Sequence, residues 1–535
     1  MRQSWLLFLL LILFNQQLVK GQSASRYQIH LTDKGSYTVS DVELSEKSLL
    51  RRENQGIELE FSDIPIYDNY LDQLIKLGID IKGKSKWMNC LFVKMNASDS
   101  VKVAALPFVK KVVKGNLYVS KTHTENFTSV HSSILPYYNY GLAKAQIRQL
   151  EGEILHNKGY QGQGMTIAVF DAGFNQVNEH SGFKKAFEDQ LITAGPDYVL
   201  GIEKIQYKHS NHGKSVLSTM LAFSEDRYVG TAPKANYILI RTEDASSESL
   251  VEEYNWLQAA EYVDSLGVDM INSSLGYTVF DDTTENHTYE ELNGDKTPIT
   301  IAADLAARKG ILVVNSAGNS GGSSWYYIGA PADGDSVFTI GSVNSEGMSS
   351  TFSSHGLTVD GRVKPNVVAH GEGIYAANGI DDYTPTNGTS FSSPVMCGMT
   401  ACLWQYLKVE NPSITNMEVI QKIEESAHLY PNFNEDYGYG IPDFNSIVPN
   451  ISVYLLNDNE TGIYPNPFSN VIYLKFSFRK KGRVELIALS GQIVYEESIP
   501  DNTLNLTLET EYIPKGIYFL RIHSNSGTKI YKVVK

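Results

Sequence analysis

Residues 387–401 read NGTSFSSPVMCGMTA, and together with two stretches upstream they decide how this chain folds. The first of these is TIAVFDAG, an apolar run that reaches Asp171. The second is NHGKSVLSTM, an amphipathic stretch that opens with His212. In chain order the three supply a carboxylate, an imidazole and, at Ser390, a hydroxyl. These are the parts of an activated serine nucleophile, with its base and the acid that orients the base.

The order of these groups separates the chain from another large class of serine hydrolases. The α/β-hydrolases run serine, acid, histidine and place the serine in a G-x-S-x-G turn. Here the serine comes last, and no glycine follows Ser390 at the required place. A serine esterase or lipase of that class is therefore disfavoured.

Taken one at a time, the three residues have ordinary structural explanations. His212 could be a surface or helix-capping histidine, Asp171 could be an N-cap or turn acid, and Ser390 could cap the helix that follows it. What favours catalysis is the local sequence that the three share.

A glycine stands within two residues of each candidate, at Gly173, Gly213 and Gly388. Glycine lets another backbone approach closely, as a substrate chain must. Pro394 suits the first turn of a helix whose N-terminus would lie at the nucleophile. The combination predicts a catalytic site that a polypeptide can reach.

Acyl transfer also needs hydrogen-bond donors aimed at the oxyanion that develops on the attacked carbonyl. In VVNSAGNSGG, Asn319 follows an apolar strand and a glycine, so its amide could project into the cleft. The backbone N–H of Ser390 would be the second donor. Asn315 lies inside the strand and is the poorer candidate for this donor. The structural alternative is that Asn319 is an ordinary turn asparagine.

The segment from residue 142 to about residue 445 alternates short apolar strands with helical stretches. This alternation predicts an α/β fold with a mostly parallel sheet and helices on both faces, whose chemistry lies beyond the carboxyl ends of the strands. The expected strands are Met165–Phe170, Tyr237–Arg241, Val268–Asn272, Ile311–Asn315 and Val337–Ile340, and two expected helices are Ser249–Leu266 and Pro298–Lys309.

This central segment resembles the subtilisin family of serine peptidases. The resemblance implies a subtilisin-like sheet and an endopeptidase that acts on extended polypeptide, with no cofactor required for the chemistry. It also implies that Ser274, Leu275 and Gly276 bind the substrate as an added strand, with Gly276 lining the pocket for the side chain before the scissile bond. The matching blocks are DAG at Asp171, HG at His212, NSSLG at Asn272, AGN ending at Asn319, and GTSFSSP around Ser390.

Four positions depart from the usual pattern of that family. It has Ser or Thr where Ala172 stands, Thr where Lys214 stands, and a Met-Ala pair where Phe391 and Ser392 stand. None of these changes removes a catalytic group. The specificity and the pH optimum, however, cannot be carried over from the family.

A structural calcium ion is the one metal that the resemblance suggests. Hard cations bind carboxylate oxygens, but the stretch that is rich in them has no EF-hand spacing. The two interpretations are a calcium site and a solvated acidic insertion, and the second is favoured. The carboxylates are Asp281, Asp282, Glu285, Glu290, Glu291 and Asp295.

The chain begins with the layout of a secretory signal, which we assign to residues 1–21. Arg2 precedes an unbroken apolar run from Trp5 to Phe14. Such a run is too short to cross a bilayer as a helix and has the length of a signal-peptide core. We therefore expect export.

Residues 22–140 read as a propeptide and activation linker. A small α+β unit is expected up to about Ser120, and it resembles the propeptide of many subtilisin relatives. That resemblance implies an inhibitor whose tail is cut between about Lys121 and Tyr140. A permanent accessory domain is the alternative. The expected elements are a helix at Asn69–Leu77 and strands at Asn89–Met95 and Val109–Val119.

The last segment, residues 463–535, predicts a small β-sandwich that follows a peptidase domain at 141–450 and a linker at 451–462. Its motifs YPNPF, ALSG, PKGIY and the basic end KVVK resemble the C-terminal sorting domain of proteins exported by the type IX route of Gram-negative bacteria. The resemblance implies a secreted or surface-attached protein that crosses both membranes. The expected strands are Val471–Phe478, Arg483–Leu489, Gln492–Tyr495, Leu504–Leu508 and Gly516–Ile522, with a turn at Ser490–Gly491.

The net charge of −15 disfavours nucleic acid as a partner, because phosphate recognition needs a basic surface. We expect protein or peptide substrates, the type IX secretion machinery as a partner, and a monomeric chain. Cys397 and Cys402 lie five residues apart in an expected helix and point differently, and Cys90 falls in another domain. All three cysteines are expected to be buried without disulfides.

The leading hypothesis is a secreted serine endopeptidase that is made as an inactive precursor and forms an acyl-enzyme on Ser390. A surface protein that keeps the fold but only binds peptides is the main alternative. The complete set of Asp171, His212, Asn319 and Ser390 argues against it.

Overall fold

The structure of the chain is a computed structural model that describes residues 25–115, 138–448, 461–464, 468, 470–524 and 527–535. The expected signal peptide, most of the expected activation linker and most of the linker at 451–462 lie outside the described residues. The chain divides into two compact units, one of residues 1–153 and 160–443 and the other of residues 154–159 and 444–535.

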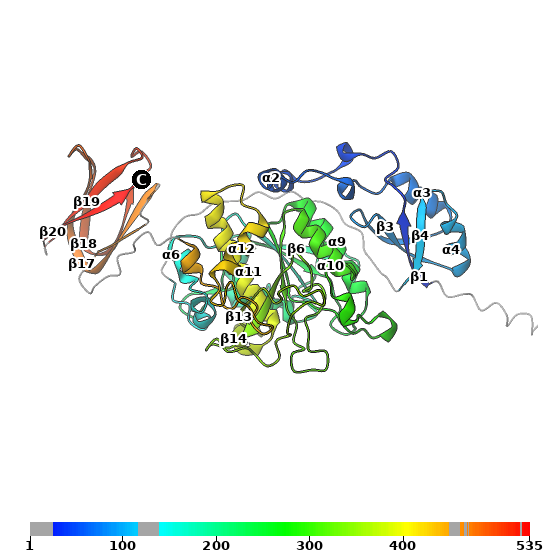
Figure 1. Cartoon of the computed structure of the whole chain (residues 1–535). Coiled ribbons are helices and arrows are strands. Elements are labelled where there is room, and N and C mark those ends of the chain that lie inside the picture. Colours follow the sequence, from blue (N-terminus) through cyan, green and yellow to red (C-terminus); the bar gives the residue numbers. More distant parts are fainter. Residues whose placement is uncertain (1–24, 116–137, 449–460, 465–467, 469, 525–526) are drawn as a thin grey trace, which may run out of the picture. The chain divides into compact units, whose positions relative to one another are not determined.

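The larger unit is built on a seven-stranded sheet in the order β13-β12-β11-β10-β5-β9-β6. All of its neighbouring strands are parallel. The side chains of these strands are buried on both faces of the sheet, which requires helices on both faces. Helices flank the sheet in this way, as predicted for this segment (Figure 1). The strands are β5 Thr166–Asp171, β6 Ile192–Asp197, β9 Asn236–Arg241, β10 Met270–Ser273, β11 Leu312–Ser316, β12 Phe338–Val343 and β13 Val367–His370.

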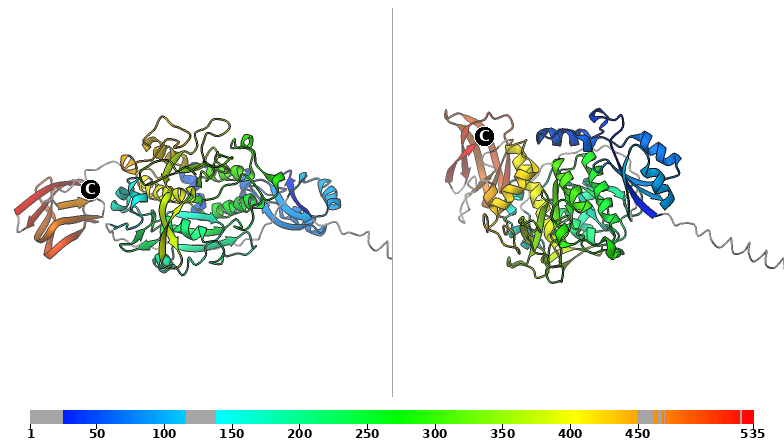
Figure 2. Two further views of the ribbon diagram at one scale, coloured as in Figure 1. Left: turned by 90° about the horizontal axis from the view of Figure 1, so that it is seen from below. Right: turned by 45° about the vertical axis from the view of Figure 1, so that its right-hand side comes forward.

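Two pairs of helices cover the sheet. Helix α8 (His212–Leu221) packs against α11 (Thr389–Glu410), and α9 (Val251–Leu266) packs against α10 (Pro298–Arg308). Ala168 and Phe170 of β5 join the core cluster of α9 and α10, so their neighbours in the strand face the other side. Figure 2 shows the ribbon of this unit from two further directions.

The predicted elements of this segment are confirmed with small shifts at their ends. Strand β10 begins at Met270 instead of Val268, and β12 continues to Val343. The sequence-based description missed two edge strands. Strand β6 contains Gly195 and Pro196, and β13 has only four residues, so neither shows a clear strand pattern.

The N-terminal part folds as the predicted α+β domain around a sheet of order β2-β3-β1-β4. Its helix α3 and strand β3 match the prediction, and α2 stands apart from the sheet (Figure 1). The elements are β1 Ser25–Leu31, α2 Glu46–Asn54, α3 Asp68–Lys76, β2 Asp80–Ser85, β3 Cys90–Met95, α4 Ala97–Ala104 and β4 Val109–Lys114.

The second unit contains a β-rich domain with its own apolar core. Four predicted strands merge into two long ones, because the chain continues through a change of register between Lys475 and Gly482. The predicted turn is confirmed: Gly491 has a φ of 85° and donates to the Ala488 carbonyl at 2.9 Å. The strands are β16 Thr461–Tyr464, β17 Val471–Ala488, β18 Ile493–Glu509, β19 Ile517–Ser524 and β20 Gly527–Val534.

The three cysteines are buried and none of them forms a disulfide, as expected. Within the described ranges, no helix combines the length and the apolar character needed to cross a membrane.

Candidate active site

Asp171 and His212 meet at the carboxyl edge of the central sheet. Asp171 is the last residue of β5 and is fully buried, and His212 is the first residue of α8. The His212 Nδ1 lies 2.9 Å from Asp171 Oδ2 and 3.1 Å from Oδ1, and the Ala172 N–H donates to Oδ1 at 2.8 Å. A carboxylate at Nδ1 keeps the proton on that nitrogen. The Nε2 of His212 is therefore left free to accept a proton.

Gly213 lets α8 start directly against the loop that follows Asp171. A Cβ at Gly213 would lie 2.4 Å from the Gly173 carbonyl oxygen and 2.9 Å from Asp171 Cγ. The Gly213 N–H donates to that same carbonyl at 3.1 Å. The expectation that this glycine makes room for substrate is corrected: it makes room for the Asp171 carboxylate that contacts His212.

Ser390 is the second residue of α11, whose N-cap is Gly388. Its side-chain hydroxyl lies 3.4 Å from the Ser274 carbonyl oxygen, which is a long contact. In the described part of the chain no hydrogen bond joins Ser390 to His212. The His212 ring instead lies near the ring of Phe391, with centroids 6.0 Å apart and the ring planes tilted by 50°. The residue after Ser390 thus contacts the His212 ring, while the Ser390 hydroxyl points at the Ser274 carbonyl.

Pro394 lies inside α11, in its second turn, because the helix begins at Thr389. The prediction that it belongs to the first turn is wrong. Proline has no N–H to offer the carbonyl four residues earlier, which here is that of Ser390. The Ser274 hydroxyl donates to this carbonyl at 2.9 Å instead. Ser274 therefore ties the backbone of Ser390 to the segment after β10.

The side-chain amide of Asn319 is oriented by Thr389. Asn319 Oδ1 accepts the Thr389 N–H at 2.9 Å and the Thr389 hydroxyl at 3.0 Å. With its oxygen held, the amide presents Nδ2 on its other side, where a Cβ at Gly388 would be only 3.7 Å away. Asn315 differs, since its Nδ2 already donates to the Leu275 carbonyl at 3.0 Å and to the Ser316 carbonyl at 2.8 Å. Both amide hydrogens of Asn315 are used, so of the two asparagines only Asn319 has amide hydrogens that can bind an oxyanion.

A cavity of about 130 Å³ opens beside Ser390. Gly276, on its wall, is exposed, and among the described residues neither its N–H nor its carbonyl has a hydrogen-bond partner. None of the lining side chains carries a charge. They are Ser274, Leu275, Gly276, Thr278, Ser316, Gly318, Asn319, Ser320, Gly329, Ser354, Thr389 and Ser390.

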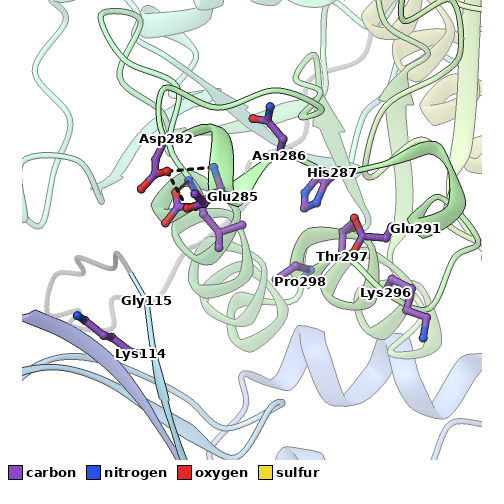
Figure 3. A pocket seen from close by; sticks show the side chains of 12 residues that line it. Lys114, Gly115, Asp282, Glu285, Asn286, His287, Glu291, Lys296, Thr297 and Pro298 are labelled. Atoms are coloured by element: carbon purple, nitrogen blue, oxygen red, sulfur yellow. Dashed lines mark hydrogen bonds between the residues drawn. The ribbon is translucent and has the colours of Figure 1, made fainter. Parts of the chain in front are cut away.

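A larger cavity, of about 640 Å³, lies elsewhere and contains none of the four candidate residues. Figure 3 shows Lys114 and Gly115, from the end of β4, on one side of it and side chains of the stretch 282–298 on the other. This stretch includes five of the six acidic residues considered for calcium, all except Asp281.

Four of those acidic side chains hold backbone N–H groups instead of converging on one point. The accepted N–H groups belong to Glu248, Leu250, Thr284 and Thr288, and the acceptors are Asp281, Glu285, Asp282 and Glu291 respectively. Across the described ranges no three His, Cys, Asp or Glu side chains are grouped closely enough to hold a metal ion.

Lys214 turns away from the base. It is buried, and its Nζ donates to the Gly379 carbonyl at 2.8 Å, in the turn between β14 (Glu372–Asn378) and β15 (Asp382–Asn387). Burial lowers the pKa of Lys214. This departure from the family pattern therefore ties α8 to a hairpin.

Glu243 is a residue near the site that the sequence-based description missed. It follows β9, which pairs with β5 so that Arg241 stands opposite Asp171. The Tyr277 hydroxyl donates to Glu243 Oε2 at 3.2 Å. Burial, and next the charge of Asp171, raise the pKa of Glu243 to about 8. No motif marked this position, because its role depends on two strands lying side by side.

The charges around His212 predict the pH dependence of activity. Burial of the ring opposes its protonation, but the charge and hydrogen bond of Asp171 outweigh burial, and with Glu243 they raise the pKa of His212 to about 9. The base must be neutral, so kcat/KM should rise with pH, with a midpoint above the ordinary value of 6.5. Glu243→Gln removes a negative charge near His212, so the pH at the midpoint of the kcat/KM profile should fall by roughly half a pH unit.

The measurement is kcat/KM for one peptide substrate against pH. Glu425→Gln, the same change at an exposed position of α12 (Asn416–Ser426), serves as the control and should leave the midpoint in place. An unchanged or higher midpoint in Glu243→Gln would contradict the assignment of Glu243.

Comparison with known proteins gives three matches along the chain. The Subtilase family model matches residues 162–440, the model of the Peptidase S8 propeptide domain of Bacteroidota matches residues 26–129, and that of the Secretion system C-terminal sorting domain matches residues 462–535. These matches confirm the three resemblances seen in the sequence.

Several curated proteins are similar to the central segment. Subtilisin E of Bacillus subtilis is 28% identical over 298 residues, which are 55% of this chain and 68% of that protein. A subtilisin of Bacillus pumilus is 28% identical over 298 residues, 55% of this chain and 94% of its own length. Alkaline elastase YaB of a Bacillus strain is 25% identical over 296 residues, 55% and 67% of the two chains.

Together the three matches describe a secreted or surface-attached serine endopeptidase that is made as a precursor. Its substrates are proteins, its export uses a secretion machinery that reads the sorting domain, and the chemistry of subtilisins needs no cofactor. Because the family model covers more than half of its length, the chain belongs to the subtilase family of serine peptidases.

Proposed function

We propose that this chain hydrolyses peptide bonds through an acyl-enzyme on Ser390, with His212 as the base, Asp171 as its orienting acid and Asn319 as an oxyanion donor. The observation that carries the proposal is the buried carboxylate at His212 Nδ1, at 2.9 Å, which leaves Nε2 free beside the start of α11. The N–H of Ser390 belongs to the first turn of that helix, where backbone donors have no partner within the helix.

In the first step the Ser390 oxygen attacks the carbonyl carbon of the scissile bond, and its proton passes to His212 Nε2. The negative charge that develops on the carbonyl oxygen accepts hydrogen bonds from Asn319 Nδ2 and the Ser390 N–H. Asp171 stabilises the imidazolium. His212 then gives its proton to the departing amine, and an ester remains on Ser390.

In the second step a water molecule gives a proton to His212 and attacks the ester. The oxyanion is held by the same donors. The proton returns to the Ser390 oxygen as the acyl group leaves as a carboxylic acid. Apart from the substrate and this water, the steps use only side chains and backbone of this chain, and a structural calcium ion stays a prediction of the family resemblance.

The substrate would lie as an extended strand along Ser274, Leu275 and Gly276. The free N–H and carbonyl of Gly276 support this arrangement, since an added strand needs such partners. The uncharged lining of the 130 Å³ cavity favours a neutral side chain before the scissile bond. We propose that the chain acts as a monomer.

We also propose the boundaries of the chain's domains and linkers. Residues 1–21 are a signal peptide, residues 22–140 a propeptide and linker cut between about 121 and 140, residues 141–450 the mature peptidase, and residues 463–535 the sorting domain after a linker at 451–462. The family matches at 26–129 and 462–535 support these limits.

Labelling with a fluorophosphonate probe tests the proposal. The processed protein should label at Ser390 and should hydrolyse casein in preference to a fatty-acid ester, and Ser390→Ala should lose both properties. Absence of labelling at Ser390 would favour a peptide-binding protein with a silent site. Faster cleavage of the ester would favour an esterase.

A further inference from the structure

Part of the N-terminal domain leaves its own sheet and lies on the peptidase domain. Residues 45–63, between β1 and α3, contain α2 and a short 3-10 helix at Phe61–Asp63. We call these residues the strap. Its side chains contact the starts of strands and the ends of helices in the central fold, all within the larger unit of the chain.

The strap reaches the edge of the sheet that is opposite to the catalytic edge. Lys47 Nζ donates to Thr166 Oγ1 at 2.6 Å and lies 3.1 Å from Asp269 Oδ2. Thr166 is the first residue of β5, and Asp269 directly precedes β10. Catalytic groups follow the other ends of these strands, so the strap lies one strand length from the cleft.

The strap also covers the C-terminal ends of α9 and α10. Arg51 donates through Nη1 to the Val268 carbonyl at 2.7 Å and through Nε to the Lys309 carbonyl at 3.1 Å. Gln55 donates to the Gly310 carbonyl at 2.9 Å. Carbonyls at a helix C-terminus lack partners within the helix, and a cation there interacts favourably with the helix dipole. The strap therefore satisfies acceptors that belong to the peptidase domain.

A buried network of alternating charges joins the two sides. Asp264 of α9 pairs with Arg51 and, at 2.8 Å, with Arg52, which also lies 2.9 Å from Asp63. Lys309, which follows α10, lies 3.1 Å from Asp63. All five of these side chains are at most 3% exposed. Removing one member of such a network leaves its partners buried and unpaired, which is strongly unfavourable.

We propose that the strap is a second anchor, separate from the cleft, that keeps the N-terminal domain bound after the linker is cut and so sets how fast activity appears. The proposal rests on the proposed function, in which that domain is a propeptide. A cut between 121 and 140 removes none of the contacts described above. Asp264, Asp269 and the ends of α9 and α10 would form the surface that the strap leaves on the mature enzyme.

The strap is not the whole interface. Glu261 of α9 accepts the N–H groups of Lys86 and Trp87, both at 3.1 Å, at the turn between β2 and β3. This contact holds the sheet of the N-terminal domain against α9. Weakening the strap alone should therefore speed release without preventing the domain from docking.

The experiment uses the full chain with Ser390→Ala, so that binding is measured without catalysis. A recognition sequence for an unrelated site-specific protease is inserted between residues 121 and 137, the purified chain is cut there, and size-exclusion chromatography follows dissociation with time. The parent chain should stay associated. Arg52→Gln and Asp264→Asn should each raise the dissociation rate by about 10²-fold or more.

Lys76→Gln is the matched control for Arg52→Gln. It removes one positive charge from the same domain, at an exposed position of α3, and should leave the rate unchanged. Immediate separation of the cut parent chain, or equal rates for Arg52→Gln and Lys76→Gln, would overturn the proposal. These outcomes do not depend on an active site, so they leave the proposed function untouched.

A milder variant covers the case in which Arg52→Gln or Asp264→Asn lowers the melting temperature of the uncut chain. Gln55→Ala removes the bond to Gly310 and a second one, at 3.0 Å, from the Asn416 N–H at the start of α12. Dissociation should be roughly tenfold faster, since about 1.4 kcal/mol of contact is lost. In the active chain the same variant should shorten the lag between cleavage and hydrolysis of a peptide. An unchanged rate and lag would contradict the strap's role.

Discussion

Replacing Ser390 with alanine is expected to lower kcat by on the order of 10⁶-fold, a loss known for this kind of triad. Alanine leaves no oxygen to attack the carbonyl, while the cavity and the oxyanion donors remain, so KM should change little. Steady-state kinetics on a peptide substrate measure both constants. If maturation is autocatalytic, the precursor should also stay uncut during refolding.

Ser392→Ala is the matched control, two residues further along the same helix. The Ser392 hydroxyl donates to the Thr389 carbonyl at 3.1 Å and does not face the base. This variant should keep its turnover and its processing. Normal cutting of purified Ser390→Ala in the absence of other proteases would show that the nucleophile lies elsewhere, and cutting only when another enzyme is added would show that maturation is not autocatalytic.

Replacing Asn319 with alanine is expected to lower kcat by about 10²-fold to 10³-fold and to change KM little. Its amide hydrogens are needed only when charge develops on the attacked carbonyl, so the loss appears in the transition state and not in substrate binding. Steady-state kinetics again separate the two constants.

Asn319→Asp distinguishes the donor from the structural role of the same side chain. Aspartate keeps an oxygen that can accept from Thr389, as Oδ1 does at 2.9 Å, but it replaces the donor with a negative oxygen. Its kcat should be at least as low as that of the alanine variant, with an unchanged melting temperature. A kcat near that of the parent chain in either variant would assign the oxyanion donor to another group.

Much of this site could be predicted from the sequence because of where its residues stand relative to strands. Asp171 ends β5, Ser274 follows β10 and Asn319 follows β11, and neighbouring parallel strands bring such positions to one edge. The strands themselves are apolar runs, since both faces of the sheet are covered, and their pattern is visible without any structure. Strands β6 and β13 lacked that pattern and were missed.

The features that could not be predicted depend on contacts between residues far apart in the chain. Pro394 was placed in the first turn of its helix, but its effect on the site comes from the carbonyl it frees at Ser390, which Ser274 then holds at 2.9 Å. Glu243 belongs to no motif and gains its influence on His212 from the pairing of β9 with β5.

By itself, the sequence determined the class of the fold, the order of the domains and the residues proposed for the chemistry, because these follow from local apolar patterns and short motifs. Only the tertiary structure decided which asparagine has donors to spare, where Lys214 points and how the strap reaches the far edge of the sheet. Those outcomes depend on hydrogen bonds and buried charges that exist once distant segments pack together. Their partners, such as Arg52 and Asp264, stand more than 200 residues apart and share no local pattern.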